Sequence, residues 1–327
     1  MSNRKPRSQA VFLGVILLLI LVMIGSLAQI VRYTIWGNDA GEQDAASKTV
    51  IKNGVAYFPR QDITVVMVAG IDQQGKVQAS GSYNNHGAAD MIMLLILDDA
   101  NEKYDVLYLN RDTMMPVPVL GIGGKPAGTY FGQLALAHTY GTGLEDSCEN
   151  TRKAVSDFLM GIRIDYYMVM NMDAVSILAD AVGGVTVNVE EDFSSVDPAI
   201  PMGTVTLKGE QALNYVRTRK AVGDQLNLSR IDRQKKFMNG FVDAFREAGG
   251  SDTKFFTSTY DAVAEYLVTD CSVKTVNNLY QRYSEYTLGQ IYTPEGENIK
   301  GEKYYEFYAD EEKLEDLTLQ LFYAPKK

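Results

Sequence analysis

Residues 90–110, DMIMLLILDDANEKYDVLYLN, decide the fold of this chain because they consist of two apolar runs joined by a polar turn. Continuous apolar runs, as opposed to alternating ones, are typical of strands that are buried on both faces. The connecting residues DDANEK favour a turn between the two strands. The stretch therefore predicts a β-hairpin inside a covered sheet.

Strands and helices alternate on both sides of this hairpin. The run ITVVMVAG (63–70) predicts a buried strand that ends in a glycine turn, and NTRKAVSDFLMG (150–161) predicts a helix capped by Asn150 or Thr151. Alternating elements with buried strands imply helices on both faces of the sheet. We therefore expect one α/β domain, a three-layer α/β/α fold with a mixed central sheet. Further helices are expected at 173–184, 207–219, 228–250, 273–286 and 310–322, and further strands at 166–172, 185–189 and 304–309.

The N-terminal region predicts a membrane anchor. Residues 10–28 are 19 residues without a charge, and Arg4, Lys5 and Arg7 precede them. A segment of this length crosses a bilayer as a helix, and the basic flank keeps the N-terminus in the cytoplasm. A cleaved signal peptide is the alternative. The expected organisation is a cytoplasmic tail (1–9), one transmembrane helix (10–32), an extracytoplasmic stem (33–58) and one large outer domain (59–327).

Composition excludes one class of partner. The formal net charge is −10, which argues against general affinity for nucleic acid. The chain has two cysteines, Cys148 and Cys271, with no C-x-x-C spacing, so a zinc site is not expected. Outside the membrane they are free to form a disulfide, or else they are two buried thiols.

A basic segment contrasts with this acidic composition, since residues 217–236 hold seven Lys or Arg and two Asp. The apolar stripe of the expected helix, Phe237, Phe241 and Phe245, places Arg230 and Gln234 on the inward face. An inward arginine requires an anion. The turn before this helix brings Arg217 and Arg219 towards it. Solvated arginines at a helix end, and a surface ion pair for Arg230, are the alternatives.

Polar residues also follow the ends of the expected strands. The motif NRDT (110–113) places Arg111 at a strand end, where ligands bind in α/β sheets. Asp72 and Asp90 both lie beside glycine turns, and two carboxylates near a phosphate suit Mg²⁺. Ordinary turn aspartates are the alternative. We expect His86 and His138 to be structural, and GIGGKPAG (121–128) to be a flexible loop over the site.

Together these segments resemble the LytR–CpsA–Psr family of bacterial cell-wall proteins. The resemblance covers roughly residues 60–245. It is carried, in order, by GID (70–72), Asp90, NRDT (110–113), IDYYMVMNMDAV (164–175), VGGVTVNV (182–189), LKGEQALNYVRTR (207–219) and the residues GD, SR and RQ within 223–234.

The resemblance implies an activity outside the membrane of a bacterium, and it favours a Gram-positive one. Members of this family transfer a glycopolymer from an undecaprenyl-pyrophosphate carrier to peptidoglycan, and the lipid tail lies in an apolar groove. Carried over, the pyrophosphate would be bound by Arg111, Arg217, Arg219, Arg230 and Gln234. The metal Mg²⁺ would be held by Asp72 and Asp90, with Asp90 as the expected base and Arg111 as its catalytic partner.

The sequence departs from the family pattern at two places. Ala88 stands where the pattern has an arginine, and Gln73 and Gln74 follow GID where another arginine is often found. One positioned donor can be worth a few kcal/mol of transition-state stabilisation. A protein that binds a polyprenyl phosphate without catalysis is therefore the alternative function.

Overall fold

The computed structural model describes residues 49–218, 222–223, 227–249, 252–272, 275, 278–279, 282–283 and 286–326. The predicted cytoplasmic tail (1–9) and transmembrane segment (10–32) lie outside these residues, as does Arg219. Within the described part of the chain, no helix is long and apolar enough to span a bilayer.

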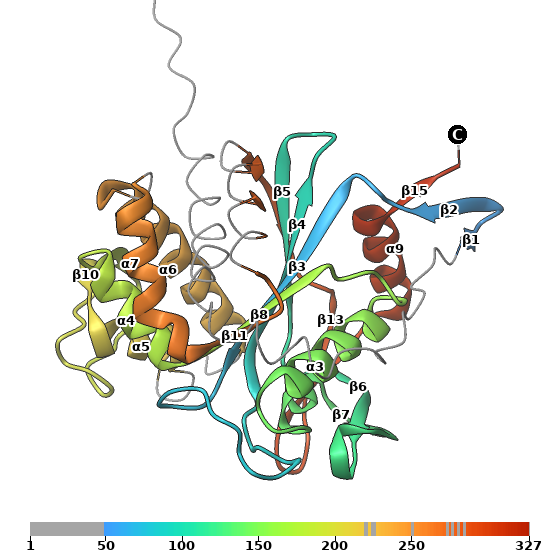
Figure 1. The fold of residues 1–327 in the computed structure, drawn as a ribbon, viewed down its shortest axis with the longest axis horizontal. Helices are drawn as coiled ribbons and strands as arrows, with labels where there is room; N and C mark the ends of the chain where they lie inside the picture. The colour runs from blue at the N-terminus through green and yellow to red at the C-terminus, as the bar shows by residue number, and fades with distance from the viewer. Residues whose placement is uncertain are drawn as a thin grey trace, which may run out of the picture.

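A mixed sheet of six strands forms the centre of the described structure (Figure 1). The predicted hairpin is confirmed, because its two arms are neighbouring antiparallel strands of this sheet. Pairs β3–β8 and β5–β12 are parallel, and the other neighbours are antiparallel, so the sheet is mixed as expected. The strand order is β11 (Leu267–Thr269), β8 (Tyr166–Asn171), β3 (Ile63–Ile71), β4 (Ala89–Asp98), β5 (Lys103–Leu109) and β12 (Thr287–Tyr292).

Helices cover both faces of this sheet, which gives the expected three layers (Figure 1). The apolar runs of β3 and β4 send alternate side chains to the two sides, so Met93 and Leu94 belong to different cores. One core is closed by α4 (Asp173–Ala181), α5 (Gly209–Arg217), α6 (Asn227–Glu247) and α7 (Thr253–Val263). The other is closed by α3 (Glu145–Phe158) and α9 (Glu311–Phe322).

The end of α4 and the start of α3 can be compared with the boundaries predicted from local sequence. The Gly-Gly stop of α4 is confirmed, since Gly183 adopts φ 79° and its amide returns to the carbonyl of Asp180. The predicted start of α3 is wrong, because the helix begins at Glu145, five residues before Asn150. Asn150 does not cap the helix; its buried amide donates to the carbonyls of Pro118 and Ala137, 2.9 and 2.7 Å away.

Small sheets of two or three short strands lie outside the central sheet. Residues 121–128 are not a loose loop; they form the turn and the beginning of β7 in a hairpin with β6. The end of the predicted stem (33–58) is not loose, because residues 50–52 and 55–59 form two paired strands, the second of which joins the C-terminal β15. One small sheet has three strands, β1 (Val50–Lys52), β2 (Val55–Pro59) and β15 (Tyr323–Pro325). The two-stranded sheets are β6 (Met114–Leu120) with β7 (Pro126–Gln133), β9 (Val185–Val189) with β10 (Gly203–Leu207), and β13 (Gly296–Lys300) with β14 (Tyr305–Ala309).

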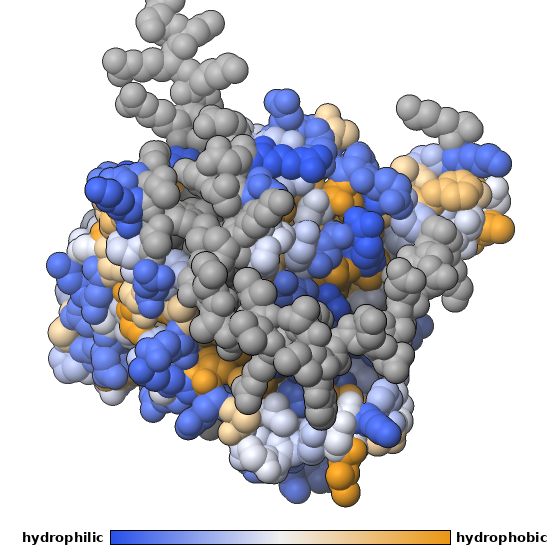
Figure 2. All heavy atoms as spheres, in the orientation of Figure 1, coloured by the Kyte–Doolittle hydropathy of each residue, from blue (hydrophilic) through white to orange (hydrophobic). Residues whose placement is uncertain are grey.

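Exposed apolar side chains on these strand pairs stand apart from the cores. Ile51 on β1 is 74% exposed, and Ile122 at the tip of the β6–β7 hairpin is 95% exposed. Figure 2 shows orange surface near β1 and β2 and near the β6–β7 tip. Scattered apolar residues of this kind are normal on a protein surface and do not by themselves mark a site.

The two cysteines are free thiols. Both side chains are buried, Cys148 in the core beneath α3 and Cys271 in the core on the other face of the sheet. The sheet therefore separates them, and the disulfide that the sequence left open is not formed. Burial raises the pKa of both thiols, which keeps them protonated and unreactive.

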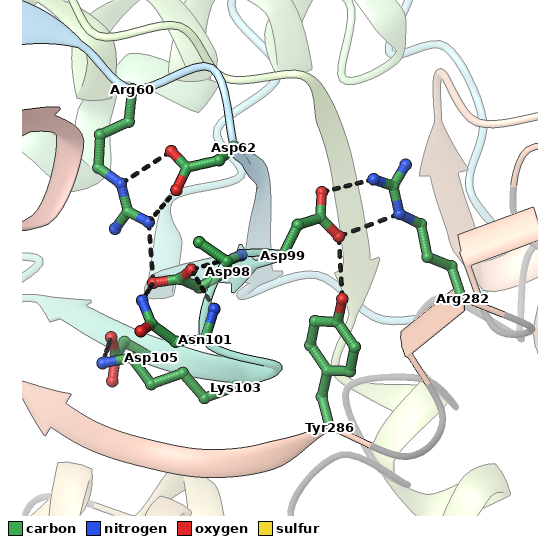
Figure 3. A network of polar contacts seen from close by, with 10 residues as sticks. Arg60, Asp62, Asp98, Asp99, Asn101, Lys103, Asp105, Arg282 and Tyr286 are labelled. Atoms are coloured by element: carbon green, nitrogen blue, oxygen red, sulfur yellow. Dashed lines mark hydrogen bonds and ion pairs between the residues drawn. The ribbon is translucent and has the colours of Figure 1, made fainter.

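A polar network secures one end of the central sheet (Figure 3). Asp98 is 1% exposed and accepts from the backbone amides of Ala100 and Asn101, both at 3.1 Å, from the Asn101 side chain at 2.9 Å, and from Arg60 at 2.9 Å. Its neighbour Asp99 binds the guanidinium of Arg282 at 2.6 Å. These bonds close the β4–β5 turn and attach it to two distant parts of the chain.

Candidate active site at the opposite end of the sheet

The site is built where β3 ends, β4 begins and β5 ends. Asp72 follows β3, Asp90 is the second residue of β4, and Arg111 lies two residues beyond β5. Because neighbouring antiparallel strands start and finish at a common edge, three segments far apart in sequence converge. The amide of Asp72 donates to the carbonyl of Ala88 at 3.0 Å, which ties the first two segments together.

A β-bulge aims the side chain of Asp90. Gly70 pairs with Met91 and Ile71 pairs with Ala89, so Asp90 is the extra residue between them. Regular alternation would send Met91 and Asp90 to opposite faces of the sheet. With the bulge, Met91 and Asp90 both line a groove on the α4–α6 side.

A closed turn presents Arg111. The side chain of Asn110 accepts from the amide of Asp112 at 3.0 Å, and the hydroxyl of Thr113 donates back to the carbonyl of Asn110 at 2.6 Å. Such an Asx turn fixes the residue between its ends. Arg111 consequently reaches across from β5 and pairs with the carboxylate of Asp90.

Helix α6 supplies a second arginine to the same carboxylate. Arg230 is 3% exposed, its Nη1 lies 3.1 Å from Oδ2 of Asp90, and its Nη2 donates to the carbonyl of Asp90 at 3.2 Å. The inward orientation expected from the phenylalanine stripe is confirmed, because Phe237 and Phe241 are buried on this side. The surface ion pair considered for Arg230 is wrong, since the residue is buried.

Arg217 and Gln234 lie at the same groove, in different roles. Arg217 ends α5, remains 41% exposed and pairs with Asp72, Nη2 to Oδ1, at 3.0 Å. Gln234 lines the groove and donates to the carbonyl of Val216 at 3.3 Å. Its neighbour Arg233 is also buried and donates to the carbonyl of Tyr215 at 3.0 Å. Residues of α6 thereby satisfy carbonyls that the end of α5 leaves open.

The groove joins a charged end to a long apolar body. It encloses about 820 Å³ when its open mouth is counted. Asp90, Arg217, Arg230 and Gln234 form its polar end, and side chains from β4, β5, β8, α4, α5 and α6 form the rest. The apolar lining consists of Met91, Tyr108, Met170, Met172, Val175, Leu178, Val216, Phe237, Met238 and Phe241. Such a shape fits an amphiphile that has an anionic head and a hydrocarbon tail.

Neutral residues, Gln73 and Ala88, stand at the two positions where the family pattern has arginines. The side-chain amide of Gln73 donates to the carbonyl of Asn85 at 2.9 Å. It also packs against Gly87, where an added Cβ would lie 2.7 Å from Nε2 of Gln73. Ala88 offers its carbonyl to Asp72. These residues fix the loop before Asp90 and bring no charge to the groove.

His138 contacts the loop before Asp90 through the carbonyl of Gly87. Its ring is 1% exposed, and Nδ1 lies 3.0 Å from the carbonyl of Gly87, so Nδ1 carries the proton and donates it. Burial lowers the pKa of His138 to about 4. The other histidine, His86, is exposed and adopts a positive φ of 60° in the loop.

Asp72 and Asp90 are the candidate metal ligands. Their carboxylates leave adjacent strand ends and are hard oxygen donors. Among the described residues, no group of three or more His, Cys, Asp or Glu side chains gathers as a metal centre. Two carboxylates suit an Mg²⁺ that takes its remaining ligands from phosphate and water, and this metal site stays a prediction.

Comparisons with known proteins identify the family of this chain. The model of the LytR_cpsA_psr family matches residues 33–322. The chain belongs to the LytR–CpsA–Psr family. It is 23% identical over 330 residues to the polyisoprenyl-teichoic acid–peptidoglycan teichoic acid transferase TagU of Bacillus subtilis strain 168, covering 98% of this chain and 97% of that one.

Solved structures of this family share the fold. Protein gbs0355 from Streptococcus agalactiae superposes with a TM-score of 0.64 at 23% identity, covering 80% of this chain and 86% of that chain. TagT bound to LI-WTA superposes with a TM-score of 0.60 at 22% identity, covering 80% and 90%. The α/β architecture built around the NRDT turn is therefore the LytR–CpsA–Psr fold.

Sequence reasoning found the charged end of the groove and missed most of its body. Asp90, Arg111 and Arg230 meet as expected, and Arg217 pairs separately with Asp72 beside the same groove. Arg219 lies outside the described residues. The methionines at 91, 170 and 172 line the groove, and their apolar side chains gave no signal of a ligand site in the sequence. The NRDT motif included Asp112, but the contact of Asp112 with Gln133 was also missed.

Proposed function

We propose that this chain is a membrane-anchored, extracytoplasmic phosphotransferase that moves a glycopolymer from an undecaprenyl-pyrophosphate carrier to peptidoglycan. The observation that carries the proposal is the pairing of Arg111 and Arg230 around Asp90 at the charged end of an apolar groove. The relatives named teichoic acid transferases support the same class of reaction. Teichoic acid, capsule and other glycopolymers remain open as the transferred group.

The groove suits the lipid carrier and the arginines suit its diphosphate. A polyprenyl chain would lie along the apolar lining, which places its head group against the polar end. Guanidinium groups bind phosphate oxygens in pairs and stay charged, so Arg111, Arg217 and Arg230 can compensate charge that builds on the bridging oxygen. Arg219 and Gln234 complete the proposed binding set.

Asp90 is the proposed base. In the structure its charge is compensated by two arginines. An incoming diphosphate would compete for those arginines, and Asp90 would then be available to take the proton of the attacking sugar hydroxyl. Mg²⁺ held by Asp72 and Asp90 would supply additional charge stabilisation to the phosphate oxygens.

The membrane placement rests on the sequence before residue 33. The apolar segment 10–32 would anchor the chain, with residues 33–327 outside the cell, where peptidoglycan is the acceptor. A reporter enzyme that is active only outside the cytoplasm, fused after residue 327, tests this topology. Activity of the fusion supports it, and an inactive fusion that is present at normal levels contradicts it.

The central experiment is transfer by Arg111→Ala. The full-length protein in detergent would be supplied with a polyprenyl-diphosphate-linked oligosaccharide and a peptidoglycan acceptor. We expect the wild type to transfer the sugar and the variant to lose at least about 100-fold in rate, because a positioned donor is removed. Full activity of Arg111→Ala would reject the assignment of this site.

The replacements at 73 and 88 favour one second candidate, a homologue that holds a polyprenyl phosphate without catalysis. Gln73 and Ala88 make neutral contacts where the family pattern has arginines. Mass spectrometry of lipid that copurifies with the protein tests binding in both cases. Mg²⁺-dependent cleavage of the diphosphate by the purified protein would exclude the non-catalytic candidate.

A further inference from the structure

Gln133, the last residue of β7, connects the active-site turn to the C-terminal part of the chain. Its Nε2 donates to Oδ1 of Asp112 at 2.9 Å and to the carbonyl of Tyr305 at 2.8 Å. One side-chain amide has two N–H donors, so a single Gln133 can satisfy both acceptors at once. The two acceptors lie far apart in sequence, and Gln133 joins them in space.

Asp112 passes this restraint to the arginine beside it. Its side chain is only 4% exposed, and Oδ1, which accepts from Gln133, lies 3.5 Å from Nε of Arg111. The guanidinium of Arg111 thus has Asp112 at its Nε side and Asp90 at Nη1. The contact at Nε is electrostatic, at ion-pair distance, and together with the pairing at Nη1 it favours one orientation of the planar guanidinium.

The C-terminal hairpin β13–β14 provides the fixed wall behind this arrangement. The amide of Phe307 on β14 donates to the carbonyl of Asp112 at 2.9 Å, and Phe307 forms a parallel bridge with Thr113. Phe307 is itself 5% exposed. The backbone of Asp112 is therefore fixed by β14, and the side chain of Asp112 is fixed by Gln133.

We propose that Gln133 is a positioning residue for the transfer reaction, which holds Asp112 and, through it, sets the orientation of Arg111 against Asp90. The inference rests on the proposed function of this site. Gln133 does not line the groove, so its effect falls on the reacting end and not on binding of the lipid. Gln133 also bonds to the carbonyl of Tyr305, so the C-terminal hairpin helps to hold Gln133 in place.

The chemistry at position 133 is specific. Methionine has a similar length and no donor, so Gln133→Met leaves Asp112 and the carbonyl of Tyr305 without this contact. Glutamate has the same shape, but its carboxylate repels Asp112 when it is ionised and regains a donor when it takes up a proton. The two variants therefore separate the loss of a donor from the addition of a charge.

The test measures the steady-state transfer kinetics of full-length Gln133→Met. We expect kcat to fall about 10- to 100-fold, because small misplacements of a catalytic group have effects of this size. KM for the lipid-linked donor should stay within about twofold, since the groove is untouched. Gln211→Met is the matched control, because the half-buried Gln211 donates to the carbonyl of Ala199 at 3.1 Å and does not line the groove.

Gln133→Glu adds a readout that a purely structural role would not move. Its activity relative to the wild type should rise as the pH is lowered, because protonation removes the repulsion and restores a donor to Asp112. The same relative activity at every pH would contradict the positioning role, as would a wild-type kcat for folded Gln133→Met.

A structural readout keeps the inference independent of the assay. In a crystal structure of Gln133→Met, the guanidinium of Arg111 should leave its position against Asp90, and an unchanged ion pair would overturn the proposal. Arg111→Ala is run in parallel. An inactive wild type would reject the proposed function, whereas an active wild type, an inactive Arg111→Ala and a fully active Gln133→Met would reject only the role of Gln133.

Discussion

The two ends of strands β3, β4 and β5 carry similar residues and differ in how those residues are satisfied. At one end Arg60 pairs with Asp98, whose carboxylate also accepts from two backbone amides of its own turn. At the other end Asp90 pairs with Arg111 and Arg230, which come from different elements and border an apolar groove. The two aspartates are eight positions apart on β4, which is about 27 Å along a strand.

This difference shows that arginine and aspartate alone do not identify a site. A carboxylate that closes its own turn is part of the fold and has little capacity to bind anything else. A carboxylate whose partners are side chains that can also bind phosphate can exchange those partners when a ligand arrives. The groove beside Asp90, together with its exchangeable partners, distinguishes the reacting end from the structural end.

The sharpest test of the comparison places the same substitution at both ends. Arg230→Lys should lower the transfer rate about 100-fold, because lysine cannot reproduce the paired hydrogen bonds of the guanidinium fork. Arg60→Lys should leave transfer within about twofold of the wild type. Initial rates with the lipid-linked donor measure both, and an equal loss in the two variants would remove the functional distinction between the ends.

The structural end should respond in stability. Arg60→Ala removes one partner of a nearly inaccessible Asp98, which keeps its contacts with Asn101 and Ala100. We expect the free energy of unfolding to fall by about 2 kcal/mol, less than for a fully uncompensated buried charge. Urea unfolding measures it. Arg282→Ala is the control, with a loss below about 1 kcal/mol, because Arg282 is 61% exposed.

A larger side chain can fill the apolar part of the groove without changing the charged residues around Asp90 or Asp98. Val175 on α4 lines the groove, so Val175→Phe should weaken binding of a polyprenyl phosphate about tenfold. Ser176→Phe adds a ring to the same helix at a residue that is not part of the lining. Titration with a fluorescent polyprenyl phosphate checks both, and equal affinity of the Val175 variant and the wild type would show that the tail binds elsewhere.

A smaller effect concerns the loop that carries Asp90. Burial lowers the pKa of His138 to about 4 from an ordinary 6.5, so the unfolded chain takes up a proton before the folded one does. The free energy of unfolding therefore falls as the pH drops through this window. Between pH 7 and pH 5.5 the wild type should lose about 1 kcal/mol more than His138→Asn, which keeps a donor for Gly87 and does not titrate.

Urea unfolding at several pH values measures the contribution of His138 to the free energy of unfolding, with the wild type compared with His138→Asn and with His86→Asn. Burial raises the pKa of Asp270 to about 6, so that group favours the folded state as the pH falls and acts against His138. Asp270 is present in both proteins, and the difference between them removes it. His86→Asn is the control for loss of an imidazole at an exposed position. Parallel pH curves for the wild type and His138→Asn would contradict the prediction.

The parts of the fold that sequence could predict are those with a strong local signal. The hairpin at 90–110, the strand at 63–70 and the glycine stop after Ala181 each depend on neighbouring residues. The start of α3 could not be predicted from Asn150, because the amide of Asn150 is used by Pro118 and Ala137. Tertiary partners overrode a local capping preference.

The site divides in the same way. The spacing of Arg230 and Phe237 on one helix was enough to place an arginine on the inward face from the sequence alone. The support of Arg111 by Asp112 and Gln133 could not be predicted, because it depends on β14 lying against β6. The expected ligand came from the resemblance to a family, because the helical spacing of residues does not indicate which anion an arginine binds.

The bulge at Asp90 has a consequence for how this sequence can vary. The direction of Asp90 depends on one surplus residue in β4 relative to β3, and not on a contact that another side chain could replace. Deleting Ala89 would bring Asp90 opposite Ile71 in regular pairing and turn its carboxylate to the face opposite that of Met91. Length is therefore constrained at this point more tightly than residue identity, and the segment should tolerate substitutions better than insertions or deletions.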